Sequence, residues 1–169
     1  MTSIMHRIPT FVDTLSRRLN LGIEYLLFGL GISMSLIVAA QVFFRYALNS
    51  SLFWSEELAR FMLVWLTFLG ASVAYRRRDH PGVDVLSSRM PPWMKRAAAV
   101  AVHLISIGLF CVMIVFGYRF AHFVRFQISP ALYMPKWILF SIIPVSGAIL
   151  TLHGVAFLLA ELTGDDGDR

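Results

Sequence analysis

Residues Phe43–Phe61 read FFRYALNSSLFWSEELARF, and they place four charged side chains, Arg45, Glu56, Glu57 and Arg60, between two long hydrophobic stretches. A charged side chain near the hydrocarbon core of a membrane is costly unless it finds a partner or lies at the interface. The stretch is therefore predicted to be the turn of a membrane hairpin that holds its charges at the interface.

The hydrophobic residues on either side of this stretch are too numerous for a soluble core. They make up 57% of the 169 residues and occur in long blocks. A helix needs about 20 apolar residues to cross about 30 Å of hydrocarbon. The sequence predicts an all-α membrane protein, one domain with four transmembrane helices near residues 22–44, 58–75, 97–120 and 138–160. Pro144 is expected to kink the fourth of these helices.

Both chain ends carry further signals. Before the first span, hydrophobic residues recur at steps of three and four, which predicts an amphipathic helix over residues 4–19. We expect it to lie along the headgroups, with its arginines toward anionic lipids, so membrane lipids are one expected partner. The acidic segment 163–169 has no apolar residues to fold around, and we expect it to be disordered.

The distribution of Lys and Arg predicts the orientation. Ten of these 15 residues lie on the side of the N-terminus, the loop at residues 76–96 and the C-terminus. Because cytoplasmic loops carry the excess of Lys and Arg, both termini are predicted to be cytoplasmic. The net charge of +5 is thus a topology signal, and with no room for an exposed basic domain a nucleic-acid partner is not expected.

The charges of the hairpin can be satisfied within one helix. Ser55 is predicted as the N-cap, which puts Glu56 and Glu57 in the first turn, where the helix dipole favours acidic groups. Arg60 follows at three- and four-residue spacing, so an ion pair with either glutamate is expected. Two interpretations remain open at this point: a structural cap with an ion pair, or a surface that recognises another protein.

A longer set of residues resembles a known family. The set is Phe44-Arg45-Tyr46, Asn49 and Trp54–Arg60, followed by Trp65–Ala71, Arg76-Arg77, His80 and Val83-Asp84. It closely resembles the small membrane subunit (Q-type) of tripartite ATP-independent periplasmic (TRAP) transporters. The signature covers roughly residues 43–86, and residues 97–169 match only in their hydrophobic layout.

The resemblance implies a function and partners. It implies a non-enzymatic scaffold that braces a large membrane subunit of elevator type, in a sodium-coupled secondary transporter of the bacterial inner membrane. A periplasmic binding protein would deliver an organic acid. Substrate and sodium sites would belong to the large subunit, so no cofactor is expected in this chain. In agreement, no acidic residue falls at the middle of a predicted span, where a coupled carrier usually has one.

Two groups of residues are expected to make contacts. The partner interface or structural motif comprises Arg45, Asn49, Trp54, Glu56, Glu57, Arg60, Phe61, Trp65, Phe68 and Asp84. Within it, Phe61, Trp65 and Phe68 form a bulky helix face suited to lipid, to a partner or to ordinary packing among the chain's own four helices. The outer-loop residues Ser50, Arg125, Gln127 and Lys136 are expected to contact the binding protein. Small residues, Gly22, Gly29, Ser33 and Ala40 in the first span among them, would allow helices to approach closely.

Two alternative functions belong to different classes. His103 and His153 fall at similar depths in the third and fourth spans, as the two axial ligands of a membrane b-type cytochrome would. A homo-oligomeric channel would need a polar stripe along one helix, and the polar residues of these spans are too scattered to form one.

Asp79, His80 and Asp84 are too few for a metal site beside three arginines.

The predicted orientation can be tested by labelling. Cysteines placed at Ser3 and Asp166 should resist an impermeant thiol reagent added from the periplasmic side, because both termini are expected in the cytoplasm. Labelling of either position in intact cells would contradict this topology.

Overall fold

The computed structural model describes residues 2–77 and 91–163, with side chains from residue 11 onward except those of 92, 93, 95 and 163. Within these ranges the chain forms helices and no strand. The helices are α1 (Thr2–Ala47), α2 (Phe53–Arg77), α4 (Pro92–Phe123), α5 (Lys136–Phe140) and α6 (Ile142–Thr163). Among them, four helical stretches are long and apolar enough to cross a membrane: Phe11–Ala47, Phe53–Arg77, Arg96–Phe123 and Lys136–Leu162.

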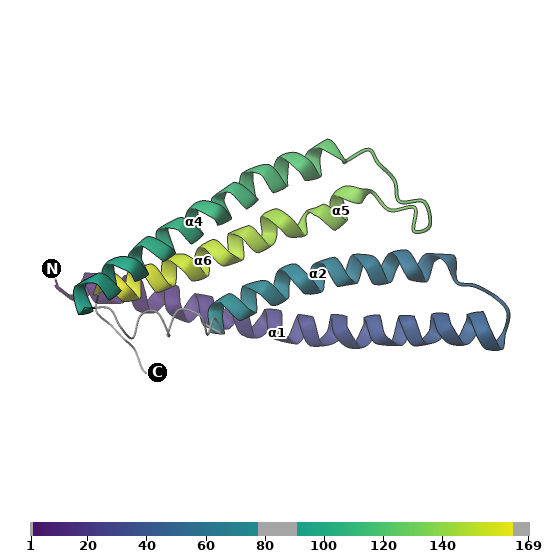
Figure 1. Cartoon of the computed structure of the whole chain (residues 1–169), viewed down its shortest axis with the longest axis horizontal. Coiled ribbons are helices and arrows are strands. Elements are labelled where there is room, and N and C mark those ends of the chain that lie inside the picture. The colour runs from purple at the N-terminus through teal and green to yellow at the C-terminus, as the bar shows by residue number, and fades with distance from the viewer. Residues whose placement is uncertain (1, 78–90, 164–169) are drawn as a thin grey trace.

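The helices form two hairpins, α1 with α2 and α4 with α5 and α6 (Figure 1). The start of α1 and the end of α6 lie at the same end of the molecule, which we name the inner end; the turns at residues 48–52 and 124–135 form the outer end. The hairpins lie together near the inner end and diverge toward the outer end. Helix α6 packs against α4, α1 and α2, so it joins the two hairpins.

The four predicted spans all fall within these helices, but the predicted helix at residues 4–19 is not a separate element. Helix α1 runs without a break for 46 residues, about 69 Å at 1.5 Å per residue. Ser16 and Asn20 are buried, so this part of α1 packs into the bundle. Its placement along the headgroups stays a prediction. Residues 164–169 of the predicted tail lie outside the described residues, as do Asp79, His80 and Asp84.

The fourth span is interrupted close to the predicted kink. Helix α5 ends at Phe140, and α6 begins at Ile142. Pro144 has no N–H to bond to the carbonyl of Phe140 four residues earlier, and its ring crowds that carbonyl. The Ser141 N–H still bonds to the Trp137 carbonyl at 2.8 Å, so the helical path continues through the interruption. The proline therefore explains where the span changes direction.

The buried apolar core lies between α1, α2 and α6. Its centre consists of Ile23, Leu69, Val73 and Ile142, and Ile142 is completely buried. Helix α4 lies against α6 on the other side, away from α1. Of the second hairpin, α6 thus supplies most of the contact with the first, and it packs against both α1 and α2.

Close helix approach occurs between α4 and α6. A Cβ atom added to Gly117 would lie 2.7 Å from Cγ2 of Ile143, and one added to Gly147 or Gly154 would lie 3.0 Å from an atom of Ile114 or Ile107. A Cβ added to Gly22 or Gly29 would meet no atom within 4 Å. The predicted small-residue stripe of the first span therefore does not pack against the chain's own helices.

The contrast between these glycines gives a stability prediction. Alanine at Gly117 should destabilise the protein by about 1–3 kcal/mol, because Ile143 and Pro144 have to move to make room. Alanine at Gly108, on the same helix but with open space around it, should be neutral or stabilising by about 0.5–1 kcal/mol. The midpoint of unfolding in mixed detergent micelles measures both. Equal effects of the two substitutions would contradict the packing described here.

Candidate functional site

The charged hairpin begins with a tight turn. Asn49 has a positive φ of 49°, a conformation that asparagine tolerates better than most residues, and the Ser50 N–H bonds to the Phe44 carbonyl at 3.1 Å. Helix α2 begins at Phe53, two residues before the predicted N-cap. Ser55 is fully buried, and its hydroxyl donates to the Leu52 carbonyl at 2.7 Å. The N-cap prediction for Ser55 is therefore wrong: the side chain is a donor inside the first turn.

Glu57 connects the two hairpins at the outer end. Its carboxylate accepts hydrogen bonds from the backbone N–H groups of Ala131 and Leu132, at 2.9 and 3.2 Å. The hydroxyl of Ser129, which is fully buried, also hydrogen bonds to this carboxylate. Successive backbone N–H groups in a turn form a site for an anion. Here the anion is a side chain from the other hairpin, so the turn after α4 is fixed against the start of α2.

Glu56 and Arg60 lie apart from this contact. Both are exposed, and among the described residues neither is in an ion pair. The predicted ion pair of Arg60 with a neighbouring glutamate is therefore not formed, although the charge of Arg60 acts on Glu57 from a distance. The same exposed side of α2 continues at steps of three and four through Leu63, Thr67 and Ala71. We name these five residues, from Glu56 to Ala71, the exposed face of α2.

The predicted bulky face of α2 is turned inward. Phe61, Trp65 and Phe68 are half-buried, and Trp65 and Phe68 pack against the core that surrounds Leu69 and Ile142. Hydropathy does not separate an inward apolar face from one that faces lipid, because both are apolar. The structure therefore assigns these aromatic residues largely to the chain's own packing.

Three further predicted motif residues lie at the outer end. Arg45, Asn49 and Trp54 are exposed, around the turn that joins α1 to α2. Ser50, Arg125 and Gln127 of the expected binding-protein contact are exposed as well, and Lys136 is half-buried. The Lys136 N–H bonds to the Gln127 carbonyl at 2.8 Å, which brings the two ends of the second outer turn together. Contact of these residues with a binding protein stays a prediction.

The inner end is held by ion pairs between α1 and α2. Between these helices, Asp13 pairs with Arg76 at 2.5 Å and Glu24 pairs with Arg77 at 3.0 Å. Asp13 also pairs with Arg17 of its own helix at 3.2 Å. The guanidinium of Arg76 also lies 5.1 Å from the centre of the Phe157 ring of α6, close enough for a cation–π interaction. Arg76 is only 11% exposed, so three helices share this one cation.

A buried hydrogen bond lies next to these ion pairs. Ser16 of α1 and His153 of α6 are both fully buried, and the serine hydroxyl lies 2.6 Å from Nδ1 of the imidazole. His103 of α4 instead lies beside Phe157, with 5.9 Å between ring centres. The two histidines thus have different neighbours, and Gly154 packs against Ile107 between their helices. This arrangement gives no support to the haem alternative.

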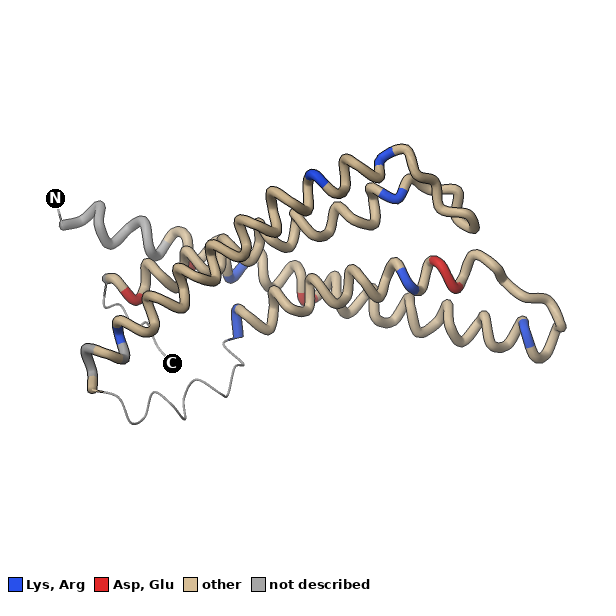
Figure 2. The backbone as a smooth tube through the Cα atoms, turned by 45° about the horizontal axis from the view of Figure 1, so that its top comes forward, with Lys and Arg blue, Asp and Glu red and all other residues tan. Residues whose placement is uncertain are grey.

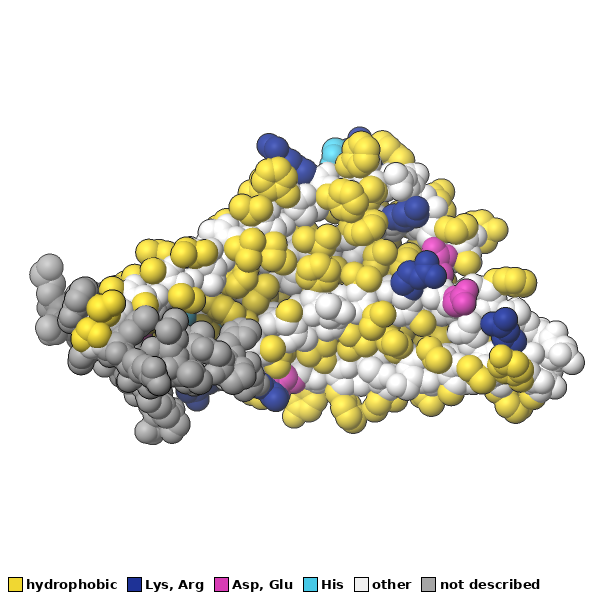
Figure 3. All heavy atoms as spheres, in the orientation of Figure 1, with side chains coloured by type: hydrophobic (Ala, Val, Ile, Leu, Met, Phe, Trp, Pro, Cys, Tyr) yellow, Lys and Arg dark blue, Asp and Glu magenta, His cyan; other side chains and the backbone are white. Residues whose placement is uncertain are grey.

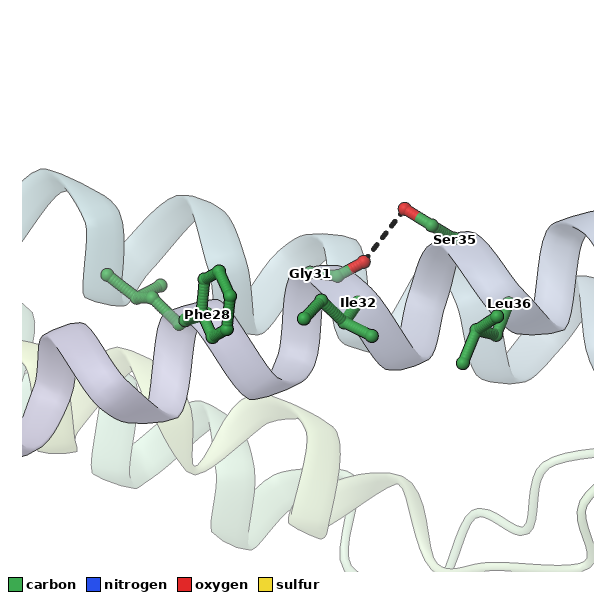
Figure 4. A pocket seen from close by; sticks show the side chains of 6 residues that line it. Phe28, Gly31, Ile32, Ser35 and Leu36 are labelled. Atoms are coloured by element: carbon green, nitrogen blue, oxygen red, sulfur yellow. Dashed lines mark hydrogen bonds between the residues drawn. The ribbon is translucent and has the colours of Figure 1, made fainter.

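An open depression lies along the surface of α1 (Figure 4). Its lining consists of Leu27, Phe28, Gly31, Ile32, Ser35 and Leu36. The Ser35 hydroxyl bonds to the Gly31 carbonyl of its own helix at 2.9 Å. With no charged side chain in its lining, this surface suits lipid or another helix, not a polar substrate. Across the described residues, no group of three His, Cys, Asp or Glu side chains is placed to hold a metal ion.

Sequence reasoning missed the acceptors and donors that act between hairpins. The bond from Glu57 reaches residues 74 and 75 positions away, and that from Ser16 reaches across 137 positions. Local spacing carries no signal for either. A signal did exist for one feature: Gly147 and Gly154 are seven residues apart, which places them on one side of α6 and indicates a close helix contact.

The contact of Glu57 predicts a local change in dynamics. Glutamine at position 57 should speed hydrogen exchange of the turn at residues 129–135, because the amide that replaces the carboxylate accepts hydrogen bonds less strongly. Exchange detected by mass spectrometry measures this effect. Glu56→Gln, one position away and exposed, is the matched control and should leave the turn unchanged. An unchanged turn in the Glu57 variant would mean that the carboxylate does not hold it.

Comparison with known proteins places the chain in a family. The sequence profile of the family described as tripartite ATP-independent periplasmic transporters, DctQ component, matches residues 34–164. The chain is 34% identical over 116 residues to the sialic acid TRAP transporter permease protein SiaT of Haemophilus influenzae, covering 68% of this chain and 18% of that protein. It is 28% identical over 162 residues to the ectoine TRAP transporter small permease protein TeaB of Halomonas elongata, covering 92% of this chain and 80% of that protein.

The share of each relative's length that is matched varies widely. The sialic acid TRAP transporter small permease protein SiaQ of Vibrio cholerae is 26% identical over 121 residues, which cover 69% of this chain and 68% of that protein. Several relatives are matched over half of their length or less. The family profile nevertheless covers more than half of this chain and includes both outer turns, the end of α1 and all of α2, α4, α5 and α6. The chain therefore belongs to the DctQ component family of tripartite ATP-independent periplasmic transporters, as a multi-pass membrane protein.

Proposed function

We propose that the chain is the small subunit of a sodium-coupled TRAP transporter that imports an organic acid, and that it braces a larger permease subunit. The observation that carries the proposal is the pair of charged residues on the exposed face of α2. Glu56 and Arg60 are exposed on a helix long and apolar enough to span a membrane. Charged side chains on such a surface are costly toward lipid and favourable toward a complementary protein.

The open glycines support the same role. Gly22 and Gly29 lie seven residues apart on one side of α1, and an added Cβ at either position would meet no atom within 4 Å. Helices in lipid associate through small residues that let backbones approach. Since the chain's own helices leave this side of α1 open, it offers a second contact for a large membrane subunit.

The relatives support a partner of larger size. SiaT is matched over 18% of its length, and the isethionate TRAP transporter permease protein DctMQ of Oleidesulfovibrio alaskensis over 17%. In these two proteins the segment similar to our chain is therefore part of a much longer permease polypeptide. A segment fused to a larger permease in one protein is a natural subunit of such a permease in another.

Ion coupling and substrate recognition fit the partner better than this chain. Of the acidic residues described, Glu56 and Glu57 lie at the outer end, Asp13 and Glu24 are paired with arginines, and Glu161 lies at the inner end. With this distribution, no described carboxylate is left unpaired in the middle of a span, where a coupled carrier usually has an acidic group. We therefore assign the sodium and substrate sites to the large subunit.

The names of the relatives indicate a broad class of substrate for this chain's transporter. Their names give sialic acid, C4-dicarboxylates, ectoine and isethionate. Each of these compounds carries a carboxylate or sulfonate, so we infer an organic acid brought by a periplasmic binding protein. The outer turns with Ser50, Arg125, Gln127 and Lys136 are the surface of this chain that such a protein can reach, with both termini in the cytoplasm and the chain in the inner membrane.

Co-purification tests the bracing role. Arg60→Ala should lower the recovery of the large subunit with this chain but leave its own membrane abundance unchanged, because Arg60 makes no ion pair within the described fold. Arg77→Ala, at the inner end of the same helix, is the matched control: its surface pair with Glu24 contributes about 1 kcal/mol or less. Unchanged recovery in the Arg60 variant would show that the partner docks on a different surface.

A further inference from the structure

Helix α4 carries an exposed apolar lane that ends at a cation. The lane consists of Ile105, Leu109, Val112 and Phe116, with 73% of Ile105 and 60% of Phe116 exposed. Their spacing of three and four places them on one side of the helix, and Arg119 continues the same row. Arg119 is exposed and lies one turn before the helix ends at Phe123. The lane therefore leads from the middle of the span toward the outer rim of the membrane.

Arg119 lacks an acidic neighbour. Its guanidinium lies 5.8 Å from the centre of the Phe116 ring, and no carboxylate pairs with it among the described residues. In the whole sequence after residue 90 the acidic residues are Glu161 and those of the tail, which all follow the last span. Figure 2 accordingly shows basic positions and no acidic one at the outer end of the α4–α6 hairpin.

The surroundings of Arg119 add positive charge and aromatic surface. Arg125 hydrogen bonds to the His122 ring and lies 4.5 Å from the centre of the Phe126 ring. The rings of Tyr118 and His122 stack with centres 6.3 Å apart. In Figure 3, basic side chains and a histidine lie among hydrophobic ones over the outer part of α4. Exposed aromatic rings at the end of a span are typical of the level of the lipid headgroups.

Arg60 on α2 is the informative contrast. It lies at the same outer end and is also exposed, but Glu56 and Glu57 precede it by one turn of the same helix. Its charge is therefore partly balanced by its own helix, whereas α4 has no acidic residue to balance Arg119. An unbalanced guanidinium at the headgroup level needs an anion, and it binds phosphate oxygens through two parallel N–H groups.

We propose that Arg119 and the apolar lane of α4 form a binding site for an anionic phospholipid. The guanidinium of Arg119 binds the headgroup phosphate, Arg125 adds positive potential, and one acyl chain lies along Phe116, Val112 and Leu109. A long basic side chain reaches the interface while its stem covers apolar surface, which lets the phosphate stay at the headgroup level. The site is independent of the proposed bracing role, because it lies on α4 and that role rests on α2 and α1.

Native mass spectrometry of the detergent-solubilised full chain tests the site. Titration with phosphatidylglycerol should give a tightly bound adduct, and phosphatidylcholine with the same acyl chains should bind more weakly, since its headgroup has no net charge. Arg119→Gln should weaken phosphatidylglycerol binding about fivefold, as expected for removal of one cation near the membrane surface. Arg119→Lys should bind more weakly than the parent chain but more tightly than Arg119→Gln, because the charge is kept while the two parallel N–H groups are lost.

An arginine on a different helix provides the matched control. Arg60→Gln removes an exposed arginine at the same end and should leave phosphatidylglycerol binding unchanged; an equal loss would indicate a general charge effect and overturn the site. Circular dichroism and gel filtration of Arg119→Gln should match the parent chain, so that a loss of binding is local. Equal binding of the two lipids by the parent chain would also overturn the proposal. So would a co-purified large subunit that abolishes the adduct and dissociates when Arg119 is replaced, since the occupant would then be protein.

Discussion

The hydrogen bond between Ser16 and His153 joins the first and the last helix, and both side chains are fully buried. Hydrocarbon offers no partner to a polar group, so a serine and an imidazole inside a membrane bundle have to find each other. This requirement brings the N-terminal third of α1 alongside α6. Ser16 lies in the part of α1 by which this helix exceeds the length that a span requires.

Polar contacts tie the hairpins at both ends, and apolar packing fills the region between them. At the inner end Arg76 reaches Asp13 of α1 and the Phe157 ring of α6. At the outer end Glu57 holds the turn at Ala131 and Leu132. A body fixed at two distant points resists changes in the angle between its halves. Such stiffness is what a subunit needs if a moving partner works against it.

The sequence predicted the helices well because long apolar blocks have few other uses, and all four spans fall within α1, α2, α4 and the α5–α6 pair. It did not predict which side of each helix faces inward. In lipid both sides are apolar, so the inward turn of Trp65 and the open space around Gly29 leave no trace in hydropathy. The partner of Glu57 was missed for a different reason. Helical spacing pointed to Arg60, while the observed partners are backbone amides of a distant turn.

The sequence distance spanned by the Ser16–His153 bond has a consequence for biogenesis. The two residues are 137 positions apart, and bacterial or eukaryotic ribosomes need roughly 7 to 30 seconds to synthesise that length. During this interval Ser16 and Asn20 are already in place on a finished helix, while the imidazole that completes the inner end does not yet exist. The α4–α6 hairpin, by contrast, closes on neighbours made just before it. The α1–α2 pair is therefore synthesised first, and its contact with α6 can form only after this last helix has been made.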